Sequence, residues 1–130
     1  MTRPNLLRYA LLADAIASGA TGVLLIAGAG LLDGLLGLPV ALMREAGLLL
    51  VPYVVLVAYV GTREQISRPA VQTIIALNIV WAVCSVGLLL TDSVAPTALG
   101  TAFVIAQAAV VAVFAELQFI GLRRQSLVAV

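Results

Sequence analysis

The chain has 130 residues, of which 63% are hydrophobic and only 10% are charged, whereas a soluble domain carries about 25% charged residues. All its basic residues are arginine, and the absence of lysine and histidine excludes a lysine Schiff base, histidine-ligated haem and a Ser–His triad. The single cysteine, Cys84, excludes an internal disulfide and a thiolate metal cluster. With a net charge of +1 nucleic acid is not an expected partner, and we expect neither a metal ion nor a cofactor.

Four apolar stretches follow one another along the chain, each long enough to cross a bilayer, which takes about 20 residues. They cover residues 6–32, 39–61, 70–91 and 96–122. The first stretch is longer than the apolar region of a signal peptide, so we predict that it is retained as a span. The connections contain Gly, Pro and charged residues and are too short for a soluble domain. The sequence therefore predicts one all-α domain, a polytopic membrane protein with four transmembrane helices in a compact bundle.

The arginines predict the orientation of this bundle. Six of the seven flank the predicted helices on one side of the membrane: Arg3, Arg8, Arg63, Arg68, Arg123 and Arg124. Only Arg44 lies on the other side. Because loops rich in Lys and Arg stay in the cytoplasm, we predict that the N- and C-termini are both cytoplasmic.

The two halves of the chain resemble each other. LLADAI (11–16) aligns with IALNIV (75–80), and LPVAL (38–42) aligns with APTAL (95–99). Each helical hairpin would then be one copy of a parallel repeat whose pseudo-axis runs along the membrane normal. Short matches also arise by chance in helices rich in alanine and leucine, so the sequence leaves a repeat and a coincidence both open.

Polar side chains within the predicted helices form the candidate site. Counted from the flanking arginines at about 1.5 Å per residue, four of them fall at a similar depth in the cytoplasmic half of the bilayer: Asp14, Asn78, Glu116 and Tyr59. Ser18 follows Asp14 on one helical stripe, and Glu116 continues a stripe of small residues suited to close packing. Ionisable groups inside a membrane are costly and mark functional sites. We therefore predict that these five side chains face inward as one ligand- or proton-binding layer.

Two further polar groups are interpreted as structural. Arg44 and Glu45 lie near the start of the second predicted helix, on the same side as Asp33 and Asp92. We predict an ion pair between Arg44 and one of these acids. Gln107 lies at mid-depth on another face of the last helix, and a buried amide needs a partner. We expect that partner within the protein or across an interface, either in a homo-oligomer or with another membrane subunit.

The leading functional prediction is that the buried acidic layer binds a lipophilic or cationic small molecule, with proton-coupled transport as an extension. Two alternatives stay open. The protein could be an accessory or structural subunit of a larger membrane complex. It could also be a membrane-embedded enzyme, such as a lipid isomerase, that uses Asp14 and Glu116 as acid and base.

Three stretches resemble a group of uncharacterised small bacterial four-helix membrane proteins: LLADA (11–15), VAPTALG (94–100) and FAELQFIGLRR (114–124), the last of which has the pattern ELQ-x-x-GLRR at its end. The group has no assigned activity, so the resemblance implies only the architecture and a place in the bacterial inner membrane.

Two characterised families are similar over less of the chain. YALLADAIASG (9–19) resembles the first helix of small multidrug resistance transporters, which implies that Asp14 exchanges protons for lipophilic cations. The motifs of their second and third helices do not line up with this chain. In size and buried acids the chain also resembles DoxX-like and EXPERA bundles. Some of these bind sterols or isomerise them through a carboxylate pair, here Asp14 and Glu116.

Overall fold

The computed structural model describes residues 6–92 and 94–128, with side chains as far as Arg124. Its elements, in chain order, are α1 (Leu6–Ala27), α2 (Ala29–Leu36), α3 (Val40–Thr62), α4 (Arg68–Leu89) and α5 (Ala98–Val128). The helices α1, α3 and α4 and the Ala98–Arg124 part of α5 are long and apolar enough to cross a membrane. The described residues form helices and no strand, so the predicted fold class is confirmed.

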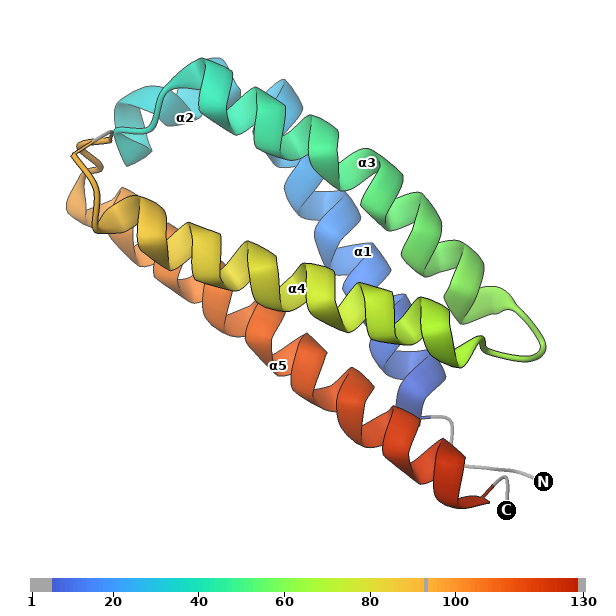
Figure 1. The fold of residues 1–130 in the computed structure, drawn as a ribbon. Coiled ribbons are helices and arrows are strands. Elements are labelled where there is room, and N and C mark those ends of the chain that lie inside the picture. The colour runs from blue at the N-terminus through green and yellow to red at the C-terminus, as the bar shows by residue number, and fades with distance from the viewer. Residues whose placement is uncertain (1–5, 93, 129–130) are drawn as a thin grey trace.

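The four long helices are arranged as two antiparallel hairpins (Figure 1). In the first hairpin α1 packs against α3, in the second α4 packs against α5, and the hairpins meet mainly where α1 contacts α5. By contrast, α3 and α4 are consecutive in the chain but contact each other little. The start of α1, the 63–67 loop and the end of α5 lie together at one end of the bundle (Figure 1). We call it the arginine end, because every described arginine except Arg44 belongs to these segments or, in the case of Arg68, begins α4 directly after the loop.

Small residues bring α1 and α3 close together. A Cβ atom on Gly47 would lie 2.9 Å from the carbonyl oxygen of Gly22, and a Cβ atom on Gly61 would lie 3.2 Å from the Cβ of Leu11. In lipid, where apolar surface gains nothing from leaving water, such close van der Waals contact is a main source of helix association. These contacts flank Asp14 on both sides along α1, and they fix the distance of Asp14 from α3.

The first predicted span is divided into two helices. We predicted one helix over residues 6–32, but the structure breaks it at Gly28 and forms α2 over Ala29–Leu36, in what was expected to be a loop. Gly37 ends α2 in the left-handed conformation, with φ of 70°, and its N–H donates to the carbonyl oxygen of Asp33 at 2.8 Å. Glycine reaches this conformation without the strain that a Cβ atom causes. The other spans begin and end within a few residues of the predicted bounds, except that α5 continues past residue 122.

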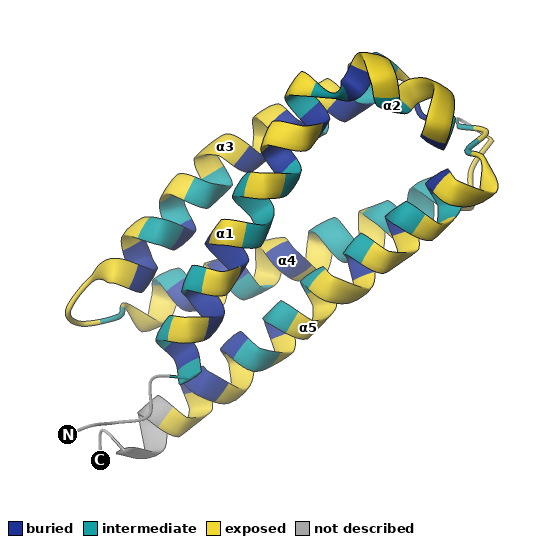
Figure 2. Cartoon of the chain, turned by 180° about the vertical axis from the view of Figure 1, so that it is seen from behind, coloured by how far each residue is buried: buried dark blue, intermediate teal, exposed yellow. Residues whose placement is uncertain are grey.

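Two apolar cores lie at the two ends of the bundle. The core near the arginine end contains Leu11 and Ile74, and the core near α2 contains Leu36 and Met43. The outward faces carry exposed residues along every helix (Figure 2), and the large ones are mostly apolar, as at Val55, of which 64% is exposed. Such a surface is stable against lipid tails and unstable in water, so the chain is a multi-pass integral membrane protein.

Candidate functional site

Asp14 lies in the interior of the bundle, with only 1% of its surface exposed. Its Oδ1 accepts a hydrogen bond from Ser18 Oγ at 2.9 Å. Its Oδ2 is approached by three groups: Tyr53 Oη at 2.5 Å, Gln118 Nε2 at 2.8 Å and Asn78 Nδ2 at 3.2 Å. Four donors from four helices thus converge on one carboxyl group, which offsets the cost of placing it in an apolar bundle.

The partners of Asp14 are also bonded to one another. Asn78 Oδ1 lies 2.7 Å from Tyr53 Oη, and Asn78 Nδ2 donates to Gln118 Oε1 at 3.0 Å. We call these five residues the Asp14 cluster: Asp14 and Ser18 from α1, Tyr53 from α3, Asn78 from α4 and Gln118 from α5. Asn78 and Gln118 are 4% and 0% exposed. The cluster therefore ties all four spanning helices together at one depth.

Three of the five residues predicted for the polar layer are in this cluster, namely Asp14, Asn78 and Ser18. The other two are elsewhere, and the expectation that they face inward is corrected. Tyr59 is 59% exposed, and the Arg63 guanidinium lies 4.6 Å from the centre of its ring. Glu116 is exposed on the outward face of α5.

The outward placement of Tyr59 and Glu116 has one physical cause. Tyr59 and Glu116 share a helical face with residues that the structure exposes, such as Pro52 on α3 and Ala109 on α5. In a membrane helix the lipid-facing side and the packed side are both apolar, so hydrophobicity does not separate them. Small residues alone did not mark the packed side of α5.

The sequence reasoning missed Tyr53 and Gln118 as members of the layer. Gln118 was visible as a polar residue on the same face of α5 as Gln107, and two amides at that spacing indicate the inward side better than one acid does. Tyr53 lies between Gly47 and Gly61, the two glycines through which α3 approaches α1. A glycine pair of this kind marks the packed side of a helix, but at 3.6 residues per turn Tyr53 lies about 120° around α3 from Gly47, so the pair does not single out Tyr53.

A cavity of about 560 Å³ lies between α3 and α4, beside the Asp14 cluster. Tyr53, Asn78 and Ser18 line it, and the rest of its wall is mostly apolar. Pro52 and Cys84 are also in its wall, and proline lacks the N–H that would complete the helical bond to the carbonyl of Leu48. We call this hollow the α3–α4 cavity. Asp14 itself is behind the wall, and it touches the cavity only through its partners.

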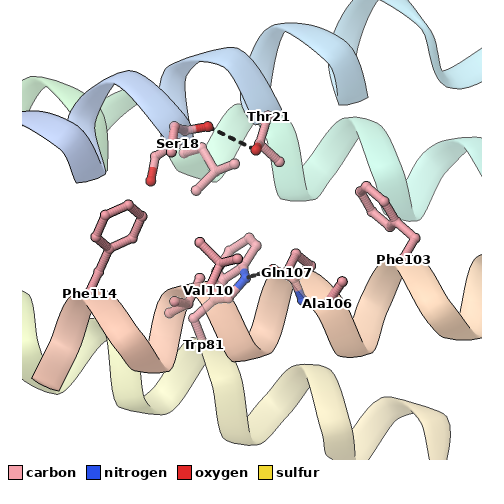
Figure 3. A pocket seen from close by; sticks show the side chains of 11 residues that line it. Ser18, Thr21, Trp81, Phe103, Ala106, Gln107, Val110 and Phe114 are labelled. Carbon is pink, nitrogen blue, oxygen red and sulfur yellow. Dashed lines mark hydrogen bonds between the residues drawn. The ribbon is translucent and has the colours of Figure 1, made fainter.

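A second hollow of about 280 Å³, which we call the α1–α5 slot, opens on the other side of the bundle (Figure 3). The slot and the α3–α4 cavity share four wall residues: Ser18, Leu50, Trp81 and Val111. A smaller hollow of about 90 Å³ continues from the slot toward α2, and Trp81 and Gln107 line it. Trp81 therefore borders all three hollows in the middle of the bundle.

Gln107 has its partners inside the bundle. Its Oε1 accepts from Trp81 Nε1 at 2.9 Å, and its Nε2 donates to the Val104 carbonyl oxygen at 3.0 Å. The prediction that Gln107 needs a partner is met within the chain.

The predicted ion pair at the α2 end does not form. Arg44, Glu45, Asp33 and Asp92 are all exposed, and within the described part of the chain none of them makes an ion pair. Exposed charges at a membrane surface are solvated by water and headgroups, and pairing them gains little free energy.

The Asp14 cluster consists of hydrogen-bonding side chains with one carboxyl group among them. Among the described residues no group of three or more His, Cys, Asp or Glu side chains could hold a metal ion. Glu116 lies on the opposite face of α5 from Gln118 and outside the cluster, so the acid–base pair of the enzyme alternative is not assembled.

Comparisons of the chain with protein-family models, with curated proteins and with solved structures found no match.

Proposed function

We propose that the protein binds a lipophilic small molecule within the membrane, in the α3–α4 cavity. The observation that carries the proposal is that this cavity is lined by Tyr53, Asn78 and Ser18, three direct partners of Asp14. Its volume of about 560 Å³ lies within the range of roughly 300–1,000 Å³ that is usual for small-molecule sites. An apolar wall with a few convergent polar groups is the usual composition of such a site.

Access from the lipid follows from the packing of the hairpins. Because α3 and α4 contact each other little, the cavity lies against the bilayer rather than against another helix. An exposed apolar wall on this side, which includes Leu49 and Val80, is compatible with a ligand that is already dissolved in the membrane. The ligand would enter sideways and place its polar end at Tyr53 and Asn78.

In this proposal Asp14 is a positioning residue. It holds the side chains of Tyr53, Asn78 and Ser18, which would touch the ligand, while its own surface is closed off. Removing the carboxylate would leave these partners without their common acceptor, and the polar end of the site would lose its arrangement.

The native cysteine provides the test. Cys84 is the only cysteine of the chain, it is exposed, and it lines the α3–α4 cavity. We expect decanol or decylamine to slow the reaction of Cys84 with a maleimide in the purified protein. Leu49→Phe fills the cavity and should abolish this protection, whereas Leu48→Phe, on a neighbouring exposed residue outside the cavity wall, should keep it. Equal labelling rates with and without both compounds would refute the proposal.

Proton-coupled transport is a second candidate, and a count of hydrogens in the cluster favours it. Five contacts join Asp14 Oδ2, Tyr53, Asn78 and Gln118, but the hydroxyl and the two amides supply hydrogens for only four. The single hydroxyl hydrogen of Tyr53 cannot serve the oxygens of both Asp14 and Asn78. Exchanging the amide oxygen and nitrogen of either Asn78 or Gln118 leaves more of these contacts without a hydrogen between the two atoms. A hydrogen on the Asp14 carboxyl group would complete all five contacts.

The test of transport uses a decyl quaternary ammonium ion, whose charge does not change with pH, in liposomes. If Asp14 exchanges its proton for a cation, a pH gradient drives uptake in the native protein but not in Asp14→Asn. Equal uptake in the two proteins excludes the coupling, while the Cys84 experiment still tests binding. The arginine bias favours an orientation in the bacterial inner membrane with the arginine end in the cytoplasm.

A role as a subunit of a larger complex is favoured by one observation. Glu116 is an acid on a face that otherwise meets lipid, and exposed acids are rare there. Native mass spectrometry of gently solubilised membranes tests this alternative, because a partner of fixed stoichiometry supports it and a lone monomer contradicts it.

A further inference from the structure

The α1–α5 slot has aromatic ends and a polar middle. Phe103 and Phe114 of α5 stand at its two ends (Figure 3). They are eleven positions apart in the helix, which corresponds to about 16 Å. Ser18 and Thr21 of α1 form one wall of the middle, and Gln107 of α5 with Trp81 of α4 forms the other (Figure 3). The slot is therefore elongated, with its polar groups between its ends.

The hydrogen bonds already made determine what this middle part can offer to a ligand. The hydroxyl of Ser18 donates to Asp14 and that of Thr21 donates to the Ala17 carbonyl oxygen, so both oxygens remain available only as acceptors. Gln107 Nε2 has two hydrogens, and only the one directed at the Val104 carbonyl oxygen has a partner among the described residues. The slot thus presents one donor and two acceptors. None of the described residues that line the slot is charged.

The depth of the slot distinguishes its ligand from ordinary bilayer lipid. Ser18 follows Arg8 by ten residues, which places it about 15 Å from the arginine end, near the middle of a hydrocarbon core of about 30 Å. The polar groups of a phospholipid lie at the edge of that core. Its acyl chain would meet the polar middle of the slot with CH2 groups, which accept no hydrogen bond, and would leave the Gln107 donor unpaired.

We propose that the α1–α5 slot binds an uncharged, elongated lipophilic molecule that carries a hydroxyl group near the middle of its length. The hydroxyl accepts from Gln107 Nε2 and donates to the oxygen of Ser18 or Thr21, and the apolar arms extend toward Phe103 and Phe114. The site and the ligand class both differ from those of the α3–α4 cavity. The inference therefore goes beyond the proposed function and does not rest on it.

The test uses the fluorescence of the single tryptophan, Trp81, in the purified protein. Because Trp81 also borders the other two hollows, variants in the wall of the slot assign the signal to the slot. The two probes are a methyl hydroxystearate with its hydroxyl at mid-chain and methyl stearate, which lacks the hydroxyl. We expect the hydroxy ester to bind about tenfold more tightly, as one or two added hydrogen bonds allow. Gln107→Leu should remove the difference between the two esters.

A second pair of variants keeps the test decisive if Gln107→Leu does not fold. Ala106 lines the slot, whereas Ala109 is exposed on the same helix outside every described cavity. Ala106→Phe should block binding of the hydroxy ester, and Ala109→Phe should leave it unchanged.

Three results would overturn the inference. The first is equal affinity for the two esters in the native protein, and the second is undiminished binding in Ala106→Phe. The third is quenching of Trp81 by phospholipid with brominated chains that Ala106→Phe removes but the hydroxy ester does not displace, because bilayer lipid then occupies the slot. Cys84 lines only the α3–α4 cavity, so failure of its protection by decanol or decylamine counts against the proposed function and not against the slot.

Discussion

Replacing Gln118 with leucine tests whether the Asp14 cluster stabilises the bundle. The side chain is fully buried and makes two hydrogen bonds, donating to Asp14 at 2.8 Å and accepting from Asn78 at 3.0 Å. Net values of about 0.5–1.5 kcal/mol per bond predict a loss of about 1–3 kcal/mol in the free energy of unfolding. Bonds between membrane helices average about 0.6 kcal/mol, which places the lower limit near 1 kcal/mol. Leucine has a similar volume, so the loss reports mainly on hydrogen bonding.

Glu116→Leu is the matched control, because Glu116 lies two residues away on the outward face of the same helix. We expect no loss of stability there, since removing an acid from a lipid-facing position removes an unfavourable group. Reversible unfolding by SDS in mixed micelles, followed by circular dichroism, measures both variants. A larger loss for Glu116→Leu than for Gln118→Leu would refute the assignment of the inward face of α5.

Three further predictions concern other contacts. Tyr53→Phe removes the hydroxyl between two oxygens of the cluster and should lower the free energy of unfolding by about 1–2 kcal/mol in the same SDS titration. Gly100→Ala should lower Tm by about 5 °C or more, because its Cβ would overlap the carbonyl oxygen of Leu36; Gly34→Ala, where nothing lies within 4 Å, should not change Tm. Arg8→Gln loses bonds to three carbonyl oxygens at the end of α3 and in the following loop. Trypsin should then cut the 63–67 loop several times faster, and an unchanged rate would contradict this role of the arginine.

The sequence was sufficient for the spans, because their length and apolar composition are fixed by the thickness of a bilayer. It was not sufficient for α2, since a short amphipathic helix after Gly28 has the same Gly- and Leu-rich composition as a loop. The depth of the polar layer was also predictable. Asp14 and Asn78, which the proposed repeat aligns, both belong to the cluster.

The direction in which each helix faces was less predictable. On α1 the stripe that contains Asp14 and Ser18 was assigned correctly, because its polar residues can be satisfied only inside the bundle. On α5 two faces were candidates for the packed side, one with a single acid and one with two amides. We predicted the inward face from Glu116, but the packed side is the one that carries Gln107 and Gln118. The cavities could not be predicted at all, because they depend on how far apart the helices lie, α3 from α4 in one case and α1 from α5 in the other.

The division of the cluster between the two hairpins implies an order of assembly. The first hairpin carries Asp14 together with Tyr53, and the second carries Asn78 together with Gln118. Each half can thus enter the bilayer with its polar side chains already bonded to a neighbour in the same half, which lowers the cost of insertion. The bonds of Asp14 to Asn78 and Gln118 form only when the halves meet. Two separately expressed hairpins, divided in the 63–67 loop, should therefore recognise each other in the membrane through this cluster.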